Sequence, residues 1–222
     1  IIREVRETGD EAVKRYSLLF DGAASDELKV EHNDLAAALE SLPEEVRKAF
    51  ETSADRIRAF HEKQLAGSWI HWDEDGGVGQ MVHPLARVGL YVPGGQAAYP
   101  SSLLMAAIPA QVAGVNEIVV TTPANQDGKV DPVVLAAAHL AGVDAVYKVG
   151  GVQAIAALAY GTASIPRVDK ILVPGNIFVV MAKRQVYGTV DIDQLPGPTE
   201  TMLIADEEAN PAYAASDLLA QA

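Results

Sequence analysis

Apolar residues follow different patterns in the two parts of the chain. Before Pro84 they recur at intervals of three and four, which predicts amphipathic helices. The clearest case runs from Val46 to Gln64, where a mostly apolar stripe lies on one predicted helix face. We expect helices along this stripe, over residues 33–42, and over 1–20 in two pieces that end at Asp21 and Gly22.

A β-hairpin is predicted after these helices. Residues 69–72 and 78–84 are rich in strand-forming residues and flank an acidic, glycine-rich turn. Such a hairpin is expected to place His71 and His83 across from one another, but two histidines do not make a metal site. His61, on the preceding helix, is interpreted as a solvated surface residue.

From Arg87 onward, short β-branched runs alternate with alanine-rich helical stretches. This alternation predicts an α/β fold, in which a parallel sheet is covered by helices and joined by right-handed crossovers. The runs predicted to be strands are 88–92, 117–122, 145–149, 170–173 and 202–205. We divide the chain into a helical N-terminal region plus hairpin (1–85), a sheet domain (86–200) and the start of a second α/β segment (201–222).

Glycine turns recur at four junctions of the sheet domain: 92–95 (VPGG), 149–151 (VGG), 173–176 (VPGN) and 195–199 (LPGPT). At least the first three follow a strand and precede a helix, which places them at the edge where open α/β sheets bind ligands. Glycine permits positive φ and close backbone approach there, and a helix N-terminus attracts an anion. One such turn alone is more often a tight connection, but the four together favour a ligand cleft.

Polar residues accompany these turns: Tyr91, Gln153, Asn176, Thr199 and Glu200. They are predicted to point into the cleft, although each could instead be a local cap. The dinucleotide pattern G-x-G-x-x-G and the phosphate loop are absent, as are a Ser-His-Asp arrangement and H-E-x-x-H. These patterns therefore indicate a ligand-binding α/β protein and leave the ligand open.

Composition closes several function classes. The 222 residues are 49% hydrophobic, and the formal net charge of −13 with only 17 scattered basic residues argues against a nucleic-acid partner. The absence of cysteine excludes disulfides, a thiolate zinc site and a cysteine nucleophile. No apolar run approaches the roughly 20 residues that span a bilayer, and the charged start does not look like a signal peptide. We expect a cytoplasmic protein with no membrane partner.

A series of motifs resembles the histidinol dehydrogenase family. They are VGLYVPGGQAAYPSSLLMAAIPAQVAGV, KVGGVQAIAALAYGT, IPRVDKILVPGN with AKRQVYG, PGPTE and DLLAQA, preceded by RAFHEKQ and Trp69. Together they cover essentially the whole chain. The resemblance implies an NAD-dependent, zinc-dependent homodimer that oxidises L-histidinol through histidinal to L-histidine. It also implies that residues 86–200 are an incomplete Rossmann-like NAD-binding domain with helices on both faces.

The resemblance carries individual roles to matching positions. It implies NAD contacts at Tyr91, Gln153 and Asn176, and Thr199 stands where the family usually has a substrate-contacting serine. Gln221 matches a residue that binds both zinc and substrate. Neutral Gln221 alone cannot hold Zn²⁺, which takes about four donors.

The resemblance further implies that the chain is the amino-terminal half of a longer enzyme. The chain begins at Ile1 without methionine and stops at Ala222 inside an apparent helix. The remaining zinc ligands and the proton-handling glutamate and histidine are expected beyond Ala222. We therefore expect no catalytic residue in the chain and no activity from the chain alone.

Two departures from the family pattern keep other functions open. Val173 stands where the family commonly has glycine, and Thr199 adds a methyl group to the usual serine. These changes allow a related dehydrogenase that acts on another small alcohol, such as a sulfonated diol. A non-catalytic nucleotide-binding module and a fragment that binds nothing are further alternatives.

Overall fold

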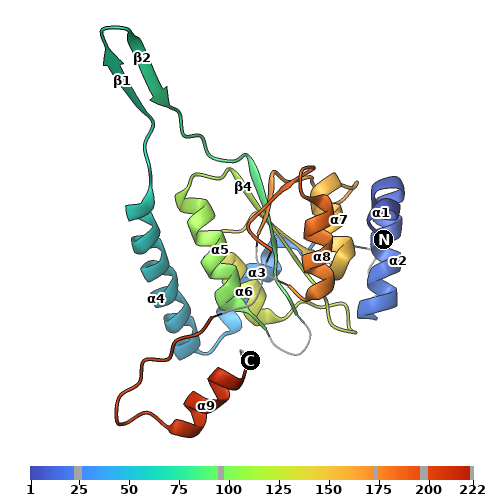
Figure 1. Cartoon of the computed structure of the whole chain (residues 1–222). Coiled ribbons are helices and arrows are strands. Elements are labelled where there is room, and N and C mark those ends of the chain that lie inside the picture. The colour runs from blue at the N-terminus through green and yellow to red at the C-terminus, as the bar shows by residue number, and fades with distance from the viewer. Residues whose placement is uncertain (23–26, 95–97, 173–174, 196–199, 221–222) are drawn as a thin grey trace.

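The chain is described here from a computed structural model that covers residues 1–22, 27–94, 98–172, 175–195 and 200–220. Its centre is a five-stranded sheet in the order β5-β4-β3-β6-β7, with every neighbouring pair parallel (Figure 1). The strands are β3 (Arg87–Tyr91), β4 (Glu117–Thr122), β5 (Ala145–Lys148), β6 (Lys170–Leu172) and β7 (Asp191–Ile192). The predicted α/β fold is confirmed.

Helices cover both faces of this sheet because its strands are apolar on both sides. Val88, Leu90 and Val120 pack in one core with α5 (Pro100–Val112) and α6 (Pro132–Leu140). Val119 and Ile171 pack in the other core with α7 (Gly151–Tyr160) and α8 (Ile177–Val186). The expected helices on both faces are therefore present.

The N-terminal helices complete these two layers. α3 (His32–Ser41) packs against α6, and α4 (Glu44–His61) packs against α5. On the other face, α1 (Ile2–Thr8) and α2 (Asp10–Asp21) pack against α7. A short link over residues 28–30 forms backbone hydrogen bonds with β5. The Val30 N–H donates to the Val146 carbonyl, and the Lys148 N–H donates to the Leu28 carbonyl.

α7 approaches the sheet closely at one position. A Cβ on Gly89 in β3 would lie 2.9 Å from Leu158 Cδ2 and 3.2 Å from Val168 Cγ2. Glycine at 89 lets the fully buried Leu158 side chain rest on the strand backbone. This contact fixes the distance between α7 and the strand that carries Tyr91.

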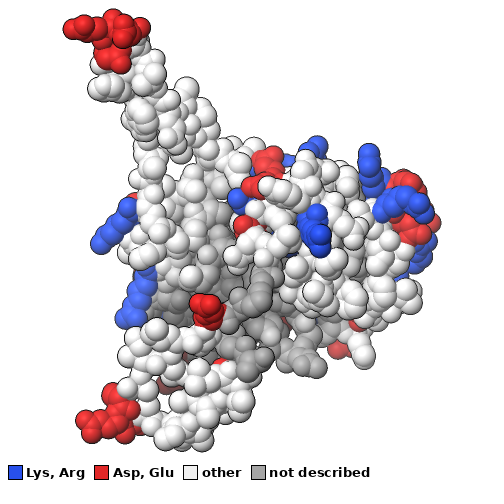
Figure 2. Space-filling model, viewed as in Figure 1, with Lys and Arg blue, Asp and Glu red and all other residues white. Residues whose placement is uncertain are grey.

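The predicted hairpin is confirmed. After the 3₁₀ turn η1 (Glu62–Gln64), β1 (Trp69–Asp73) and β2 (Gly76–Gln80) pair antiparallel and project from the body (Figure 1). Its tip is acidic (Figure 2), and the Asp73 carboxylate accepts the N–H groups of Asp75 and Gly76 to close the turn. The expected pairing of two histidines is wrong, because His71 lies opposite Val78 and His83 lies beyond β2.

The C-terminal part departs from prediction. The strand expected over 202–205 is not formed, and Met202 and Ile204 are 86% and 91% exposed. No strand among the described residues lies beside this run, so its backbone has no neighbour with which to form the hydrogen bonds of a sheet. The expected helix that follows is α9 (Pro211–Leu219), capped by the Asn210 side chain. Within the described part of the chain, no helix is long and apolar enough to cross a bilayer.

We predict that Leu158→Ala lowers the free energy of unfolding by about 2–5 kcal/mol, because a fully buried leucine leaves a cavity against β3. Leu19→Ala, on the exposed side of α2, is the matched control and is expected to change stability by about 0.5 kcal/mol or less. Urea unfolding followed by far-ultraviolet circular dichroism measures both. Equal effects would show that α7 is not anchored at Gly89.

Candidate functional site

The strand order reverses direction at β3. β4 and β5 follow on one side of it, whereas the chain returns to place β6 and β7 on the other side. Ligands of open parallel sheets bind beyond the carboxyl ends of the strands at such a reversal. Tyr91 is the last residue of β3, and Asn176 follows β6 and begins α8. Tyr91 and Asn176 therefore both lie at the edge of the sheet where the topology favours a ligand.

Gly151, which follows β5, and Gly175, which follows β6, both contact Tyr91. The Gly151 N–H donates to the Tyr91 phenol oxygen at 3.3 Å, and a Cβ on Gly175 would lie 2.9 Å from Tyr91 Cε1. Gly151 has φ 62°, a left-handed conformation that favours glycine. Burial raises the pKa of the Tyr91 phenol above its usual range, so it remains a neutral hydroxyl at physiological pH.

Gln153 lies in the first turn of α7, next to this contact. It is 0% exposed, and neither its Nε2 nor its Oε1 has a hydrogen-bond partner among the described residues. A Cβ on Gly151 would lie 3.0 Å from its Oε1. Buried amides in native proteins are nearly always satisfied, so the unsatisfied amide makes Gln153 a candidate ligand contact.

Asn176 performs the local role that the sequence left open. Its Oδ1 accepts the N–H groups of Phe178 and Val179, both at 3.1 Å, and so caps α8. The cap uses the amide oxygen, and Nδ2 takes no part in it. Asn176 is thus held rigidly at the edge of the cleft, one residue after the Gly175 contact with Tyr91.

Asp21 joins the site from outside the sheet. It is the last residue of α2, and its half-buried carboxylate accepts the Gly150 N–H. Burial raises the pKa of this carboxyl above its usual value, which the Gly150 hydrogen bond only partly offsets. The sequence pattern identified Asp21 only as a helix end, since nothing local indicates that it meets the turn after β5.

A pocket of about 780 Å³ opens beside Asp21. Gly94 from the turn after β3 and Thr122 from the end of β4 also line it. It therefore extends the Tyr91 cluster toward β4, at the same edge of the sheet.

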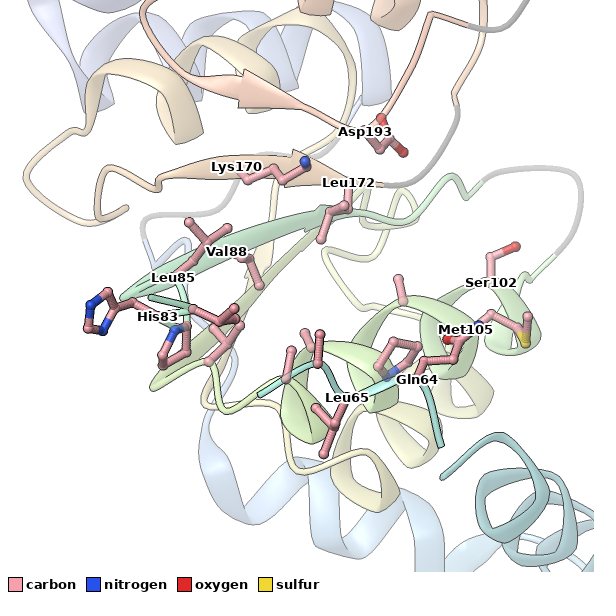
Figure 3. A pocket seen from close by; sticks show the side chains of 18 of the residues that line it. Gln64, Leu65, His83, Leu85, Val88, Ser102, Met105, Lys170, Leu172 and Asp193 are labelled. Carbon is pink, nitrogen blue, oxygen red and sulfur yellow. The ribbon is translucent and has the colours of Figure 1, made fainter. Parts of the chain in front are cut away.

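A larger pocket, of about 900 Å³, lies elsewhere, between the hairpin stem, α5 and the strands β3 and β6 (Figure 3). Leu65, Leu85, Met105 and other apolar side chains dominate its wall. Its charged members already form ion pairs, Lys170 with Asp191 and Asp193 with Lys183. This apolar pocket is therefore better suited to packing against apolar side chains than to binding a polar ligand.

Other predicted site residues contribute less. Thr199 and Gln221 lie outside the described residues, and Glu200 is exposed. Among the residues that the structure describes, no group of three or more His, Asp or Glu side chains is arranged to hold a metal ion. The Lys and Arg side chains on the face shown in Figure 2 are scattered, with no extended basic surface.

Comparison with known proteins identifies the family. The family model described as histidinol dehydrogenase matches residues 1–222. The chain belongs to the histidinol dehydrogenase family. It is similar to the histidinol dehydrogenases of Deinococcus radiodurans (53% identity over 222 residues) and Synechococcus sp. (51% over 225 residues).

A solved member of the histidinol dehydrogenase family has the same fold. The crystal structure of histidinol dehydrogenase from Elizabethkingia anophelis superimposes with a TM-score of 0.90 at 36% identity, over 99% of this chain and 51% of that one. The two bacterial relatives match all of this chain and 50% and 52% of their own lengths. The chain thus spans about half the length of the histidinol dehydrogenases it matches.

We predict that Asp21→Asn raises the stability of the ligand-free protein near neutral pH. The pKa of the Asp21 carboxyl is raised in the folded state. Its contribution to the stability of the wild-type protein is therefore fully present below the unfolded-state pKa, and it is lost as pH rises through the folded-state pKa. The stability difference in favour of the variant should therefore grow from about pH 4 to about pH 7. Urea unfolding across this range measures it, and a difference independent of pH would contradict it.

Proposed function

We propose that this chain forms the NAD-binding half of an enzyme that oxidises L-histidinol through histidinal to L-histidine. The observation that carries the proposal is the fully buried amide of Gln153, which has no hydrogen-bond partner among the described residues and lies near Tyr91 at the reversal of the strand order. The named activity of the relatives supports the substrate. The complete enzyme is expected to be a cytoplasmic homodimer.

The residues of the cleft fit a dinucleotide. The N-termini of α7 and α8 both lie at this edge, and their dipoles favour the negative pyrophosphate. The neutral Tyr91 hydroxyl, the Gln153 amide and Asn176 Nδ2 offer donors and acceptors for the hydroxyl and amide groups of NAD. NAD, when bound, accepts the hydride, and these side chains hold and orient it.

Contacts with zinc and substrate are assigned to residues outside the described part of the chain. Thr199 is proposed to contact the substrate, and Gln221 to contact both substrate and zinc, by similarity to the family. The described residues do not form a zinc site by themselves. The other zinc ligands and the acid–base residues are therefore proposed to come from the part of the enzyme that this chain does not contain.

The first test is NAD reduction by the complete polypeptide that carries this chain. We expect histidinol to support formation of about two NADH for each histidine produced, one for each two-electron step. A chelator is expected to abolish turnover while leaving NAD binding intact. Turnover of a sulfonated or other small alcohol in place of histidinol would replace the proposed substrate, and absence of NAD binding would overturn the proposal.

The second test isolates the Gln153 amide. Gln153→Met keeps the volume and removes both polar atoms, so stability should stay the same or rise, because the Gln153 amide forms no hydrogen bond with the described residues. NAD affinity is expected to fall about tenfold or more in calorimetry.

Gln185→Met on the exposed side of α8 is the matched control, and NAD affinity should not change. Wild-type affinity in Gln153→Met would show that the buried amide does not meet the cofactor.

A further inference from the structure

One fully buried charge has no part in the proposed function. Lys183 lies in α8 and is 1% exposed, and its ammonium group forms an ion pair with the carboxylate of Asp193, whose side chain is 21% exposed. Lysine is among the residue types least often buried, because the ammonium group loses its hydration. Burial of this lysine therefore calls for a specific role.

A buried ion pair is a poor means of stabilising a fold. The attraction between the two charges is largely offset by the loss of their hydration, and an apolar pair of similar volume is often as stable or more stable. What an ion pair supplies instead is selectivity, because a buried ammonium group is satisfied only where a carboxylate meets it. The best-attested use of such pairs is to fix the register of the elements that they join.

The ion pair joins α8 to the end of β7, and a strand as short as β7 offers few backbone hydrogen bonds to determine its register. The Asp191 N–H donates to the Asp169 carbonyl at 3.0 Å. The Asp193 N–H donates to the Ile171 carbonyl at 3.1 Å. Side chains alternate between the two faces of a strand, so a slip by one residue would turn the Asp193 carboxylate away from Lys183. The ion pair thus specifies one register.

Asp193 also orients the chain that leaves the sheet. Its Oδ1 both pairs with Lys183 and accepts the Gln194 N–H, the latter at 2.7 Å. Figure 3 shows Asp193 on the segment that continues from the sheet. Thr199, to which we assign a substrate contact, follows six residues after Asp193 in the sequence. The path along the chain from the buried charge to the proposed substrate contact is therefore short.

We propose that the Lys183–Asp193 ion pair is a positioning element for the substrate site, which fixes the register of β7 and thereby the course of the chain toward Thr199. The inference rests on the proposed function and extends it, since Lys183 and Asp193 touch neither substrate nor cofactor in this role. Loss of the pair is expected to impair the use of histidinol and to leave NAD binding at Tyr91 and Gln153 intact. A role in stability alone would not separate the two ligands.

The test compares variants of the complete, zinc-containing polypeptide in steady-state NAD reduction. Lys183→Met combined with Asp193→Leu replaces both charges by apolar side chains, so the thermal midpoint should stay the same or rise. The kcat/KM for histidinol is expected to fall about tenfold to a hundredfold, because small displacements of a substrate contact cost this much. The Kd for NAD, measured by calorimetry, should change by less than about twofold. Asp193→Asn, which keeps an oxygen for both donors, should lower kcat/KM less.

Lys170→Met combined with Asp191→Leu is the matched control, because it makes the same substitutions in the other lysine–aspartate pair of β7. That pair is 2.8 Å long, and its side chains are 30% and 53% exposed. Exposed pairs contribute little, so kcat/KM for histidinol and the Kd for NAD should both match wild type.

Hydrogen–deuterium exchange gives a readout that does not depend on activity. Mass spectrometry of peptides that cover residues 191–195 measures it. Exchange in this segment should be faster than wild type in the double variant at 183 and 193, because the register of β7 is no longer fixed by the ion pair. It should be slower in the matched control than in that double variant.

The outcomes separate this inference from the proposed function. Wild-type kcat/KM for histidinol in the double variant at 183 and 193 would overturn the positioning role and leave the dehydrogenase proposal standing. Loss of folding, an equal loss of histidinol use and NAD binding, or the same loss in the matched control would also overturn it. Wild-type protein that neither binds NAD nor oxidises histidinol would overturn the proposed function, and this inference with it.

Discussion

The carboxyl edge of the sheet depends on the contacts that Tyr91 makes with Gly151 and Gly175. Gly150 and Gly151 follow β5, and Gly175 follows β6, so turns from both sides of β3 meet at one aromatic residue. A Cβ at 175 would lie 2.6 Å from Val179 Cγ1 and 2.9 Å from Tyr91 Cε1, and the left-handed backbone at 151 would strain any residue other than glycine. The turn residues at this edge are therefore held in place by contacts within the chain, and the proposed ligand would require little rearrangement of the backbone.

This preorganisation has a cost in the free protein. Among the described residues, the buried amide of Gln153 has no hydrogen-bond partner, and the half-buried Asp21 accepts one backbone N–H. Both arrangements destabilise the folded chain when the cleft is empty. Both are explained if polar groups of a ligand complete them, since local conflicts of this kind concentrate at functional sites. The residues that lower stability thus lie at the site to which we assign the proposed recognition.

The sequence predicted the parts of the fold that have a local cause. Strand periodicity placed β3 to β6 to within one residue at each end, and the glycine turns indicated the edge at which Tyr91, Gln153 and Asn176 meet. β7 was missed, because two residues are too short for a period. The run at 202–205 was misread, because apolar pattern alone cannot supply a neighbouring strand. Asp21 was missed as a site residue because its partner Gly150 is distant in the chain.

The hairpin has a consequence for spectroscopy. The chain contains two tryptophans, Trp69 and Trp72, and both lie in β1 with 54% and 69% of their surface exposed. Their emission reports the environment of an exposed two-stranded ribbon that touches neither core nor cleft, and isolated ribbons of this kind are marginally stable in water. A change in tryptophan fluorescence of this chain will therefore report a change in the surroundings of the hairpin. Signals from the sheet come from the tyrosines.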